Sequence, residues 1–127
     1  MEVKINTREK FHAITILEPI LAANMTDKLE NYLVPFLQSD VKNVVLNLRD
    51  IRSIDNKAAE RLVQLQQLFY EKNASFVICE LQKQVEEDLD NERLLELINV
   101  TPTESEAWDI VQMEEIEREL MDGEFDN

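Results

Sequence analysis

The sequence contains one histidine, His12, and one cysteine, Cys79, and these are the side chains that most readily act as base or nucleophile near neutral pH. His12 lies in an apolar stretch with no serine or cysteine placed beside it as a nucleophile. Cys79 lies in a second apolar stretch, and a single thiol forms neither an internal disulfide nor a zinc site. We therefore expect a structural histidine, a buried thiol, no enzymatic activity and no cofactor.

Acidic residues crowd the segment 86–92, where carboxylate oxygens could in principle bind a divalent cation. A calcium loop requires alternating oxygen ligands and a glycine at its sharp turn, and the chain's single glycine is Gly123. The segment is therefore interpreted as a solvated helix face, and we predict no metal site. The scarcity of glycine also excludes a glycine-rich phosphate loop in its usual form.

The net charge of −14 belongs entirely to the C-terminal part of the chain. Residues 1–79 hold 10 acidic and 10 basic side chains, whereas residues 80–127 hold 17 acidic and three basic ones. Such a chain repels nucleic acid and anionic membranes, and no apolar run approaches the roughly 20 residues of a membrane helix. The N-terminus also lacks the pattern of a signal peptide. We therefore expect a cytoplasmic protein with no nucleic-acid partner and no membrane insertion.

Alternating strand and helix patterns position these residues. β-branched apolar runs predict strands at residues 3–8, 11–18, 44–48, 75–80 and 99–101. Helical spacing of apolar residues predicts helices from Asn24 to a break at Pro35, at 56–72, within 81–98, and after a Thr103–Glu106 capping box. Asp55 or Asn56 is expected to cap the second helix with its side chain. The order predicts one α/β domain with a mixed, mostly parallel sheet of four to five strands and about four helices.

The stretch from Val44 to Asp55 carries the most specific pattern in the chain. An apolar strand ends in Asn47-Leu48, a short polar loop follows, and Ile54-Asp55 opens a helix. This pattern, together with the element order over residues 1–112, resembles the STAS domain of bacterial anti-sigma factor antagonists. The resemblance implies a non-catalytic signalling module that regulates transcription by binding a protein, such as an anti-sigma factor or a related switch protein.

The motif departs from the family pattern at its most important position. Asp55 matches the family's aspartate, but Asn56 stands where antagonists carry the phosphorylated serine, and Lys57 and Ala58 replace the serine and glycine that follow. Residues 19–22 read Pro-Ile-Leu-Ala where members often read Gly-Glu-Leu-Asp. Asparagine has no hydroxyl, so the usual phosphorylation cannot occur at Asn56. We hypothesise that Asn56 resembles the unmodified state that binds the partner.

The resemblance places partner binding at the loop before the second helix and at that helix's first turn. The residues expected to contact the partner are Arg52, Ser53, Asp55, Asn56, Lys57, Ala58 and Arg61. A plain helix cap beside an exposed lysine is the structural alternative for this motif. Two other functions also stay open: an accessory subunit of a lipid-transport ATPase, and a sensor domain for a small ligand.

Residues 113–127 lie outside the resemblance, and we predict an acidic C-terminal helical extension with a frayed end from residue 122 onward. Its segment 114–126 holds seven acids and one arginine, which suits either a solubilising extension or a dock for a basic partner. Trp108, just before it, is either a packing residue or an exposed contact. Helical spacing predicts packing, on the domain's own sheet or on a partner, for Met113, Ile116, Leu120 and Met121.

Overall fold

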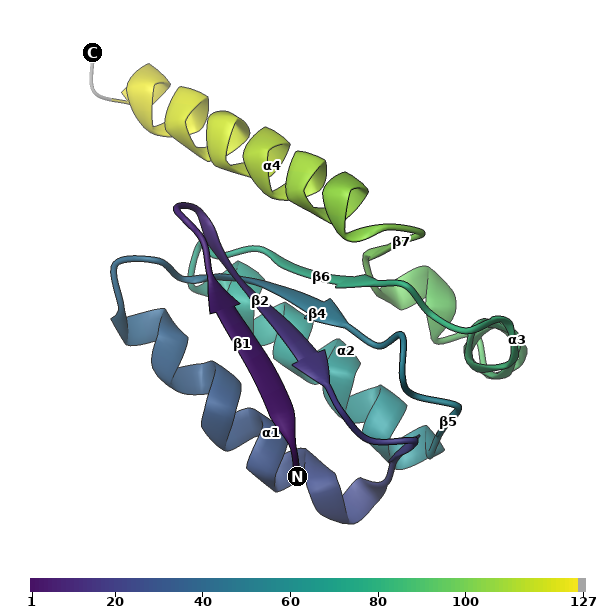
Figure 1. Ribbon diagram of the computed structural model, residues 1–127. Coiled ribbons are helices and arrows are strands. Elements are labelled where there is room, and N and C mark those ends of the chain that lie inside the picture. Colours follow the sequence, from purple (N-terminus) through teal and green to yellow (C-terminus); the bar gives the residue numbers. More distant parts are fainter. Residues whose placement is uncertain (126–127) are drawn as a thin grey trace.

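The computed structural model describes the backbone of residues 1–125 and the side chains of residues 1–121. Strands and helices alternate along the described chain (Figure 1). The strands are β1 (Val3–Thr7), β2 (Phe11–Ile16), β3 (Ile20–Leu21), β4 (Asn43–Asn47), β5 (Ser53–Ile54), β6 (Phe76–Cys79) and β7 (Val100–Thr101). The α-helices are α1 (Thr26–Leu33), α2 (Asn56–Glu71), α3 (Lys83–Asn91) and α4 (Glu104–Phe125).

The main sheet has five strands in the order β1-β2-β4-β6-β7. β1 runs antiparallel to β2, and the remaining neighbours pair in parallel. This arrangement confirms the predicted α/β class and its mixed, mostly parallel sheet. β3 and β5 form a separate two-stranded parallel ribbon that was not predicted.

Helices cover both faces of the sheet, with α1 and α2 on one face and α4 on the other (Figure 1). Alternation along β2 divides its side chains between these layers. Ile14 and Ile16 join the larger core under α1 and α2, whereas Ala13 joins a smaller cluster with Ala107 and Val111 of α4. The α4 layer therefore buries few apolar side chains, and polar contacts contribute more to holding it in place.

The start of the first helix differs from the prediction. Asn24 does not cap α1, because a 3₁₀ turn over Ala23–Met25 comes first and Met25 occupies the N-cap position. The predicted break at Pro35 is confirmed: α1 ends at Leu33 and a 3₁₀ helix over Val34–Gln38 follows. Proline has no amide hydrogen to continue the helical hydrogen bonds, and it is tolerated in the first turn of the new segment.

α4 begins at the predicted capping box and continues well past residue 112. The amide of Glu106 donates to the hydroxyl of Thr103 at 3.1 Å, which satisfies one of the free amides of the first turn. The helix extends without interruption to Phe125, so part of the end expected to be frayed is helical, and residues 126–127 lie outside the described residues. Within that described chain, no helix is both long enough and apolar enough to span a membrane.

Candidate functional site

The predicted partner-binding loop lies at the edge of the sheet where parallel strands β4 and β6 end (Figure 1). Backbone hydrogen bonds tie this loop to the segment before α1. The amide of Arg52 donates to the carbonyl of Pro19 at 2.7 Å, and the amide of Asp55 donates to the carbonyl of Leu21 at 3.0 Å. Two segments that are distant in sequence therefore form one continuous surface at this edge.

Asp55 occupies the N-cap position of α2, but its side chain does not cap that helix. Its carboxylate instead accepts a hydrogen bond from the backbone amide of Ala23 at 3.0 Å. The expected side-chain cap from Asp55 or Asn56 is therefore wrong. The physical reason is that the 3₁₀ turn before α1 presents a free amide beside the carboxylate. The Asp55 carboxylate therefore links two segments instead of accepting from the free amides at the start of α2.

Five of the predicted contact residues are exposed, and the other two are buried or partly buried. The exposed residues are Arg52, Ser53, Asp55, Asn56 and Lys57. Ala58 is completely buried, so its side chain belongs to the core. Arg61 is partly buried and forms an ion pair with Glu30 of α1, and it also donates to Gln64 at 2.9 Å. The ion pair connects α2 to α1.

Ile20 is an exposed apolar residue at this edge that the sequence did not single out. Its side chain is 49% exposed, and its register partner in the β3–β5 ribbon is Ser53. The next residue, Leu21, is fully buried, so the two residues of β3 face opposite sides. A hollow of about 290 Å³ lies beside the loop, lined by Leu17, Glu18, Pro19, Asp50, Arg52 and Gln82.

His12 is held by contacts on both ring nitrogens. Nε2 lies 2.8 Å from the carbonyl of Val41 and Nδ1 lies 2.9 Å from the hydroxyl of Thr7. A carbonyl oxygen only accepts, so Nε2 carries the proton and donates it to Val41, and in the neutral ring Nδ1 accepts from Thr7. The ring also stacks on Phe36 at a centroid distance of 3.8 Å. These contacts agree with the predicted structural role of this histidine.

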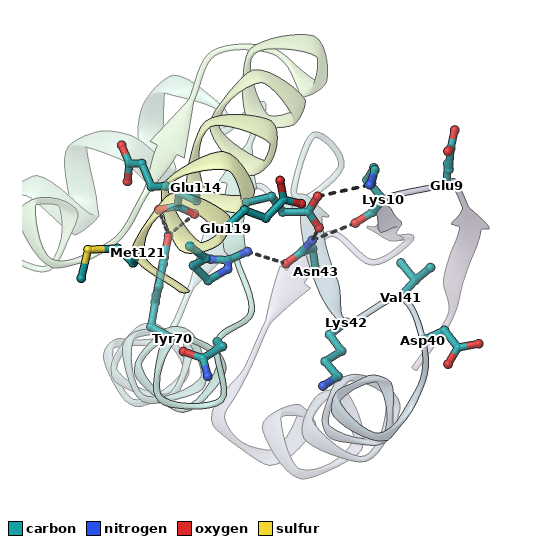
Figure 2. Close-up of a pocket in the computed structure, with 14 residues that line it drawn as sticks. Glu9, Lys10, Asp40, Val41, Lys42, Asn43, Tyr70, Glu114, Glu119 and Met121 are labelled. Carbon is teal, nitrogen blue, oxygen red and sulfur yellow. Dashed lines mark hydrogen bonds and ion pairs between the residues drawn. The ribbon is translucent and has the colours of Figure 1, made fainter. Parts of the chain in front are cut away.

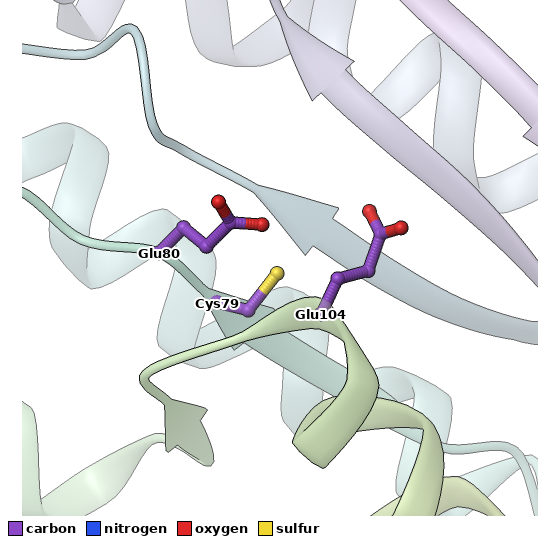
Figure 3. A group of neighbouring side chains, drawn as sticks. All are labelled: Cys79, Glu80 and Glu104. Atoms are coloured by element: carbon purple, nitrogen blue, oxygen red, sulfur yellow. The ribbon is translucent and has the colours of Figure 1, made fainter.

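Cys79 lies close to two carboxylates that the fold brings together (Figure 3). The Cys79 thiol and carboxylate oxygens of Glu80 and Glu104 lie within 4.8 Å of one another. Burial, followed by the negative charges of Glu80 and Glu104, raises the pKa of the Cys79 thiol to about 12. The carboxylate of Glu80 accepts a hydrogen bond from the Asn47 amide at 2.5 Å, which ties the ends of β6 and β4 together. The thiol is therefore neutral near pH 7, as expected for an inert core cysteine.

A second polar cluster joins α4 to the opposite edge of the sheet (Figure 2). The Tyr70 hydroxyl donates to the carboxylate of Glu114 at 2.6 Å, and burial followed by Glu114 raises the pKa of that hydroxyl well above its ordinary value. The amide of Asn43 donates to Glu115 at 2.7 Å. The guanidinium of Arg118 donates to the hydroxyl of Ser75 at 3.2 Å. Residues from the predicted extension therefore contact the body of the domain.

This second cluster borders an open hollow of about 840 Å³, in which acidic and basic side chains are mixed (Figure 2). Lys10 lies 3.7 Å from Glu115 across it. No local pattern in the sequence indicates these contacts, because the hydrogen-bonded partners lie between 43 and 75 positions apart along the chain. We assign this cluster a positioning role for α4.

Comparison with known proteins agrees with this architecture. The family model of the STAS domain matches residues 2–107. No curated protein gives a significant match. A candidate anti-sigma factor antagonist of Thermotoga maritima is similar in structure, with 18% identity and a TM-score of 0.72 over 87% of this chain and 94% of that one.

Two further solved structures show how widely this fold occurs. The anti-sigma factor antagonist SpoIIAA in its unphosphorylated form has 12% identity and a TM-score of 0.68, covering 87% of this chain and 96% of that one. The murine anion transporter Solute Carrier 26 family member A9 has 14% identity and a TM-score of 0.67, covering 81% of this chain but 18% of that one. At such identities these likenesses show the fold alone. The family-model match spans most of the sequence, and the chain therefore belongs to the STAS domain family.

Proposed function

We propose that this protein is a non-catalytic regulatory module that binds a partner protein through the exposed edge around β5 and the start of α2. We call this edge the β5–α2 surface and define it by Ile20, Arg52, Ser53, Asn56 and Lys57. The observation that supports the proposal is the exposure of an apolar side chain, Ile20, in direct register with the polar loop. An apolar centre with a polar rim is the usual composition of a protein-binding surface.

The charge of this surface suggests the chemistry of its partner. Arg52 and Lys57 are exposed cations, whereas the carboxylate of Asp55 is engaged by the Ala23 amide. Asn56 lies at the first position of α2, where free backbone amides and the helix dipole favour negative charge nearby. A partner with acidic side chains around an apolar contact complements this arrangement. An anti-sigma factor or a related switch protein is our first candidate.

Asn56→Asp tests the surface directly, with Asn6→Asp on β1 as the matched control because both asparagines are exposed. The partner is first isolated from source cells on the full-length wild-type chain and identified, and it is then purified and titrated against each variant. We expect Asn56→Asp to weaken binding about tenfold or more, a loss of about 1.4 kcal/mol, because it places a negative charge in the contact. Equal affinities for all three proteins would overturn the proposal.

The identity of the captured partner separates the two protein-binding functions that were predicted. The STAS fold also occurs within the murine anion transporter, so a transport-related partner is the second candidate. Capture of a lipid-transport ATPase subunit would favour that function, whereas capture of an anti-sigma factor would favour the first.

Incubation with ATP and a cognate kinase, followed by intact mass measurement, tests whether Ser53 or another residue accepts the phosphate that Asn56 cannot.

A further inference from the structure

α4 exposes a line of large apolar side chains on the face turned away from the sheet. Met113, Ile116 and Leu120 are 58%, 55% and 65% exposed. Their spacing of three and four residues places them on one side of the helix. Ala107 and Val111 are fully buried on the opposite side, against the sheet. Of the two alternatives left open by the sequence, packing on the domain's own sheet does not occur for these three side chains, and packing on a partner remains. Met121, the fourth residue of the predicted pattern, is also exposed and lines the hollow beside Glu114.

Acidic residues border this apolar line, which we call the α4 stripe and define by Met113, Ile116 and Leu120. Glu117 and Glu119 are exposed beside it. The segment 104–125 contains nine acids and one base, Arg118, whose guanidinium donates to Ser75 and Asn43 on the sheet side. The stripe is therefore apolar in its centre and negatively charged along its edges.

The helix that carries the stripe is held in a defined position on the domain. Glu114 accepts from the hydroxyl of Tyr70 (Figure 2). One turn later Arg118 donates to Ser75, and Glu115 accepts from the side-chain amide of Asn43. These contacts come from the turns that carry Met113 and Ile116. A rigid, preformed helix face loses little conformational entropy on binding, which favours its use as a docking surface.

Charge restricts what can cover the stripe. A second copy would place one acidic helix against another, and like charges across an interface cost binding energy. Anionic lipid surfaces are repelled for the same reason, because membrane-surface helices carry lysine and arginine beside their apolar face. A basic amphipathic helix instead offers apolar side chains for the stripe and cations for Glu117 and Glu119. We propose that the α4 stripe binds a basic amphipathic helix of a partner protein.

This site is independent of the β5–α2 surface. α4 covers the face of the sheet opposite to α2, and the two surfaces share no residue (Figure 1). Three apolar positions over two helical turns span about 10 Å, which matches one short helix of a partner in a helix-on-helix contact. The two surfaces could therefore engage different parts of one partner, or two partners at once.

The test uses the full-length protein and a synthetic helical peptide of leucine and lysine, with leucines spaced three and four residues apart. Isothermal titration compares it with a scrambled peptide of the same composition and with a leucine–glutamate peptide of the same pattern. We expect the patterned leucine–lysine peptide to bind at least about tenfold more tightly than the scrambled one, and the leucine–glutamate peptide not to bind. Equal binding of the patterned and scrambled peptides would overturn the proposal, because charge alone would then explain it.

Variants assign the binding to the stripe. The triple change Met113→Gln, Ile116→Gln and Leu120→Gln keeps good helix formers in α4 and is expected to abolish the preference for the patterned peptide. Leu97→Gln is the matched control, because Leu97 is an exposed apolar residue, 53% accessible, outside α4. Far-ultraviolet circular dichroism verifies that each variant is folded. Retention of the preference by the triple variant would refute the site.

The charged edges are tested separately. Glu117→Gln with Glu119→Gln is expected to weaken binding several-fold and to reduce its dependence on salt, because the removed charges are exposed and screened by ions.

Sedimentation analysis of the wild-type protein tests whether a second copy of the chain covers the stripe instead. A dimer that disappears in the triple variant would show that a second copy covers the stripe, and would contradict the partner proposal without affecting the β5–α2 surface.

Discussion

The carboxylate of Asp55 accepts a hydrogen bond from the backbone amide of Ala23 at 3.0 Å. This bond joins the start of α2 to the turn before α1, two segments that are 32 positions apart in the sequence. Asp55 directly precedes Asn56 of the β5–α2 surface, and its own amide donates to Leu21, the residue that follows Ile20. The residue that matches the family's aspartate therefore has a structural role in shaping this surface, in addition to any contact with a partner.

Asp55→Ala is expected to lower the free energy of unfolding by about 1 kcal/mol, the usual value for an accessible hydrogen bond. Urea denaturation measures this change, and hydrogen exchange of the Ala23 amide reports the loss of its acceptor. Asp50→Ala, at an exposed aspartate of the same loop, is the control and should change stability little. Unchanged exchange at Ala23 in the Asp55 variant would contradict the role of this bond.

Arg118→Ala is expected to destabilise the protein by about 1–2 kcal/mol. The reason is that the guanidinium, in the C-terminal part of α4, donates to both Ser75 and Asn43. Glu117→Ala is the matched control at the neighbouring exposed position. Hydrogen exchange along α4 should increase in the Arg118 variant and remain unchanged in the Glu117 variant. If both variants had the same stability, the C-terminal part of α4 would not be part of the cooperative domain.

Stability at alkaline pH should depend on Tyr70. Burial, followed by the hydrogen bond to Glu114 and its charge, raises the pKa of the Tyr70 hydroxyl above its ordinary value of 10.0. The folded state therefore retains this proton at a pH where the unfolded state loses it, so the stabilisation is complete below about pH 10 and is lost as the pH rises further. Urea denaturation between about pH 8 and about pH 11 measures this dependence.

Tyr70→Phe is the control for this pH dependence. The variant should be less stable by about 1 kcal/mol near neutral pH, since it lacks the hydroxyl that donates to Glu114, and its stability should fall less steeply in alkali. Cys79 contributes the same alkaline trend in both proteins, so the difference between them isolates Tyr70. Parallel curves for the two proteins would show that Tyr70 does not titrate abnormally.

The thiol of Cys79 should be almost unreactive in the folded protein. Its side chain is fully buried, and its pKa of about 12 leaves very little thiolate at neutral pH. Alkylation followed by intact mass should therefore be slow in buffer and fast in concentrated urea, and the single cysteine makes the measurement unambiguous. Rapid alkylation of the native protein would show that the end of β6 opens readily.

Local patterns in the sequence were sufficient for the order and type of the main elements. Apolar periodicity predicted the five sheet strands and the helices, Pro35 predicted the end of α1, and the Thr103–Glu106 pair predicted the start of α4. These features depend on residues within a few positions of one another, so they can be predicted from the sequence alone. The absence of a hydroxyl at Asn56 is likewise a covalent fact that needs no structure.

Tertiary packing decided how the functional side chains are used. It directed Asp55 to Ala23, paired Arg61 with Glu30, and placed Ile20 on the exposed side of a two-residue strand. It also turned the stripe of α4 away from the sheet. Each outcome depends on which segments meet across long separations in the chain. A hydrogen bond or ion pair forms with the nearest available group in space, and the sequence alone does not identify that group.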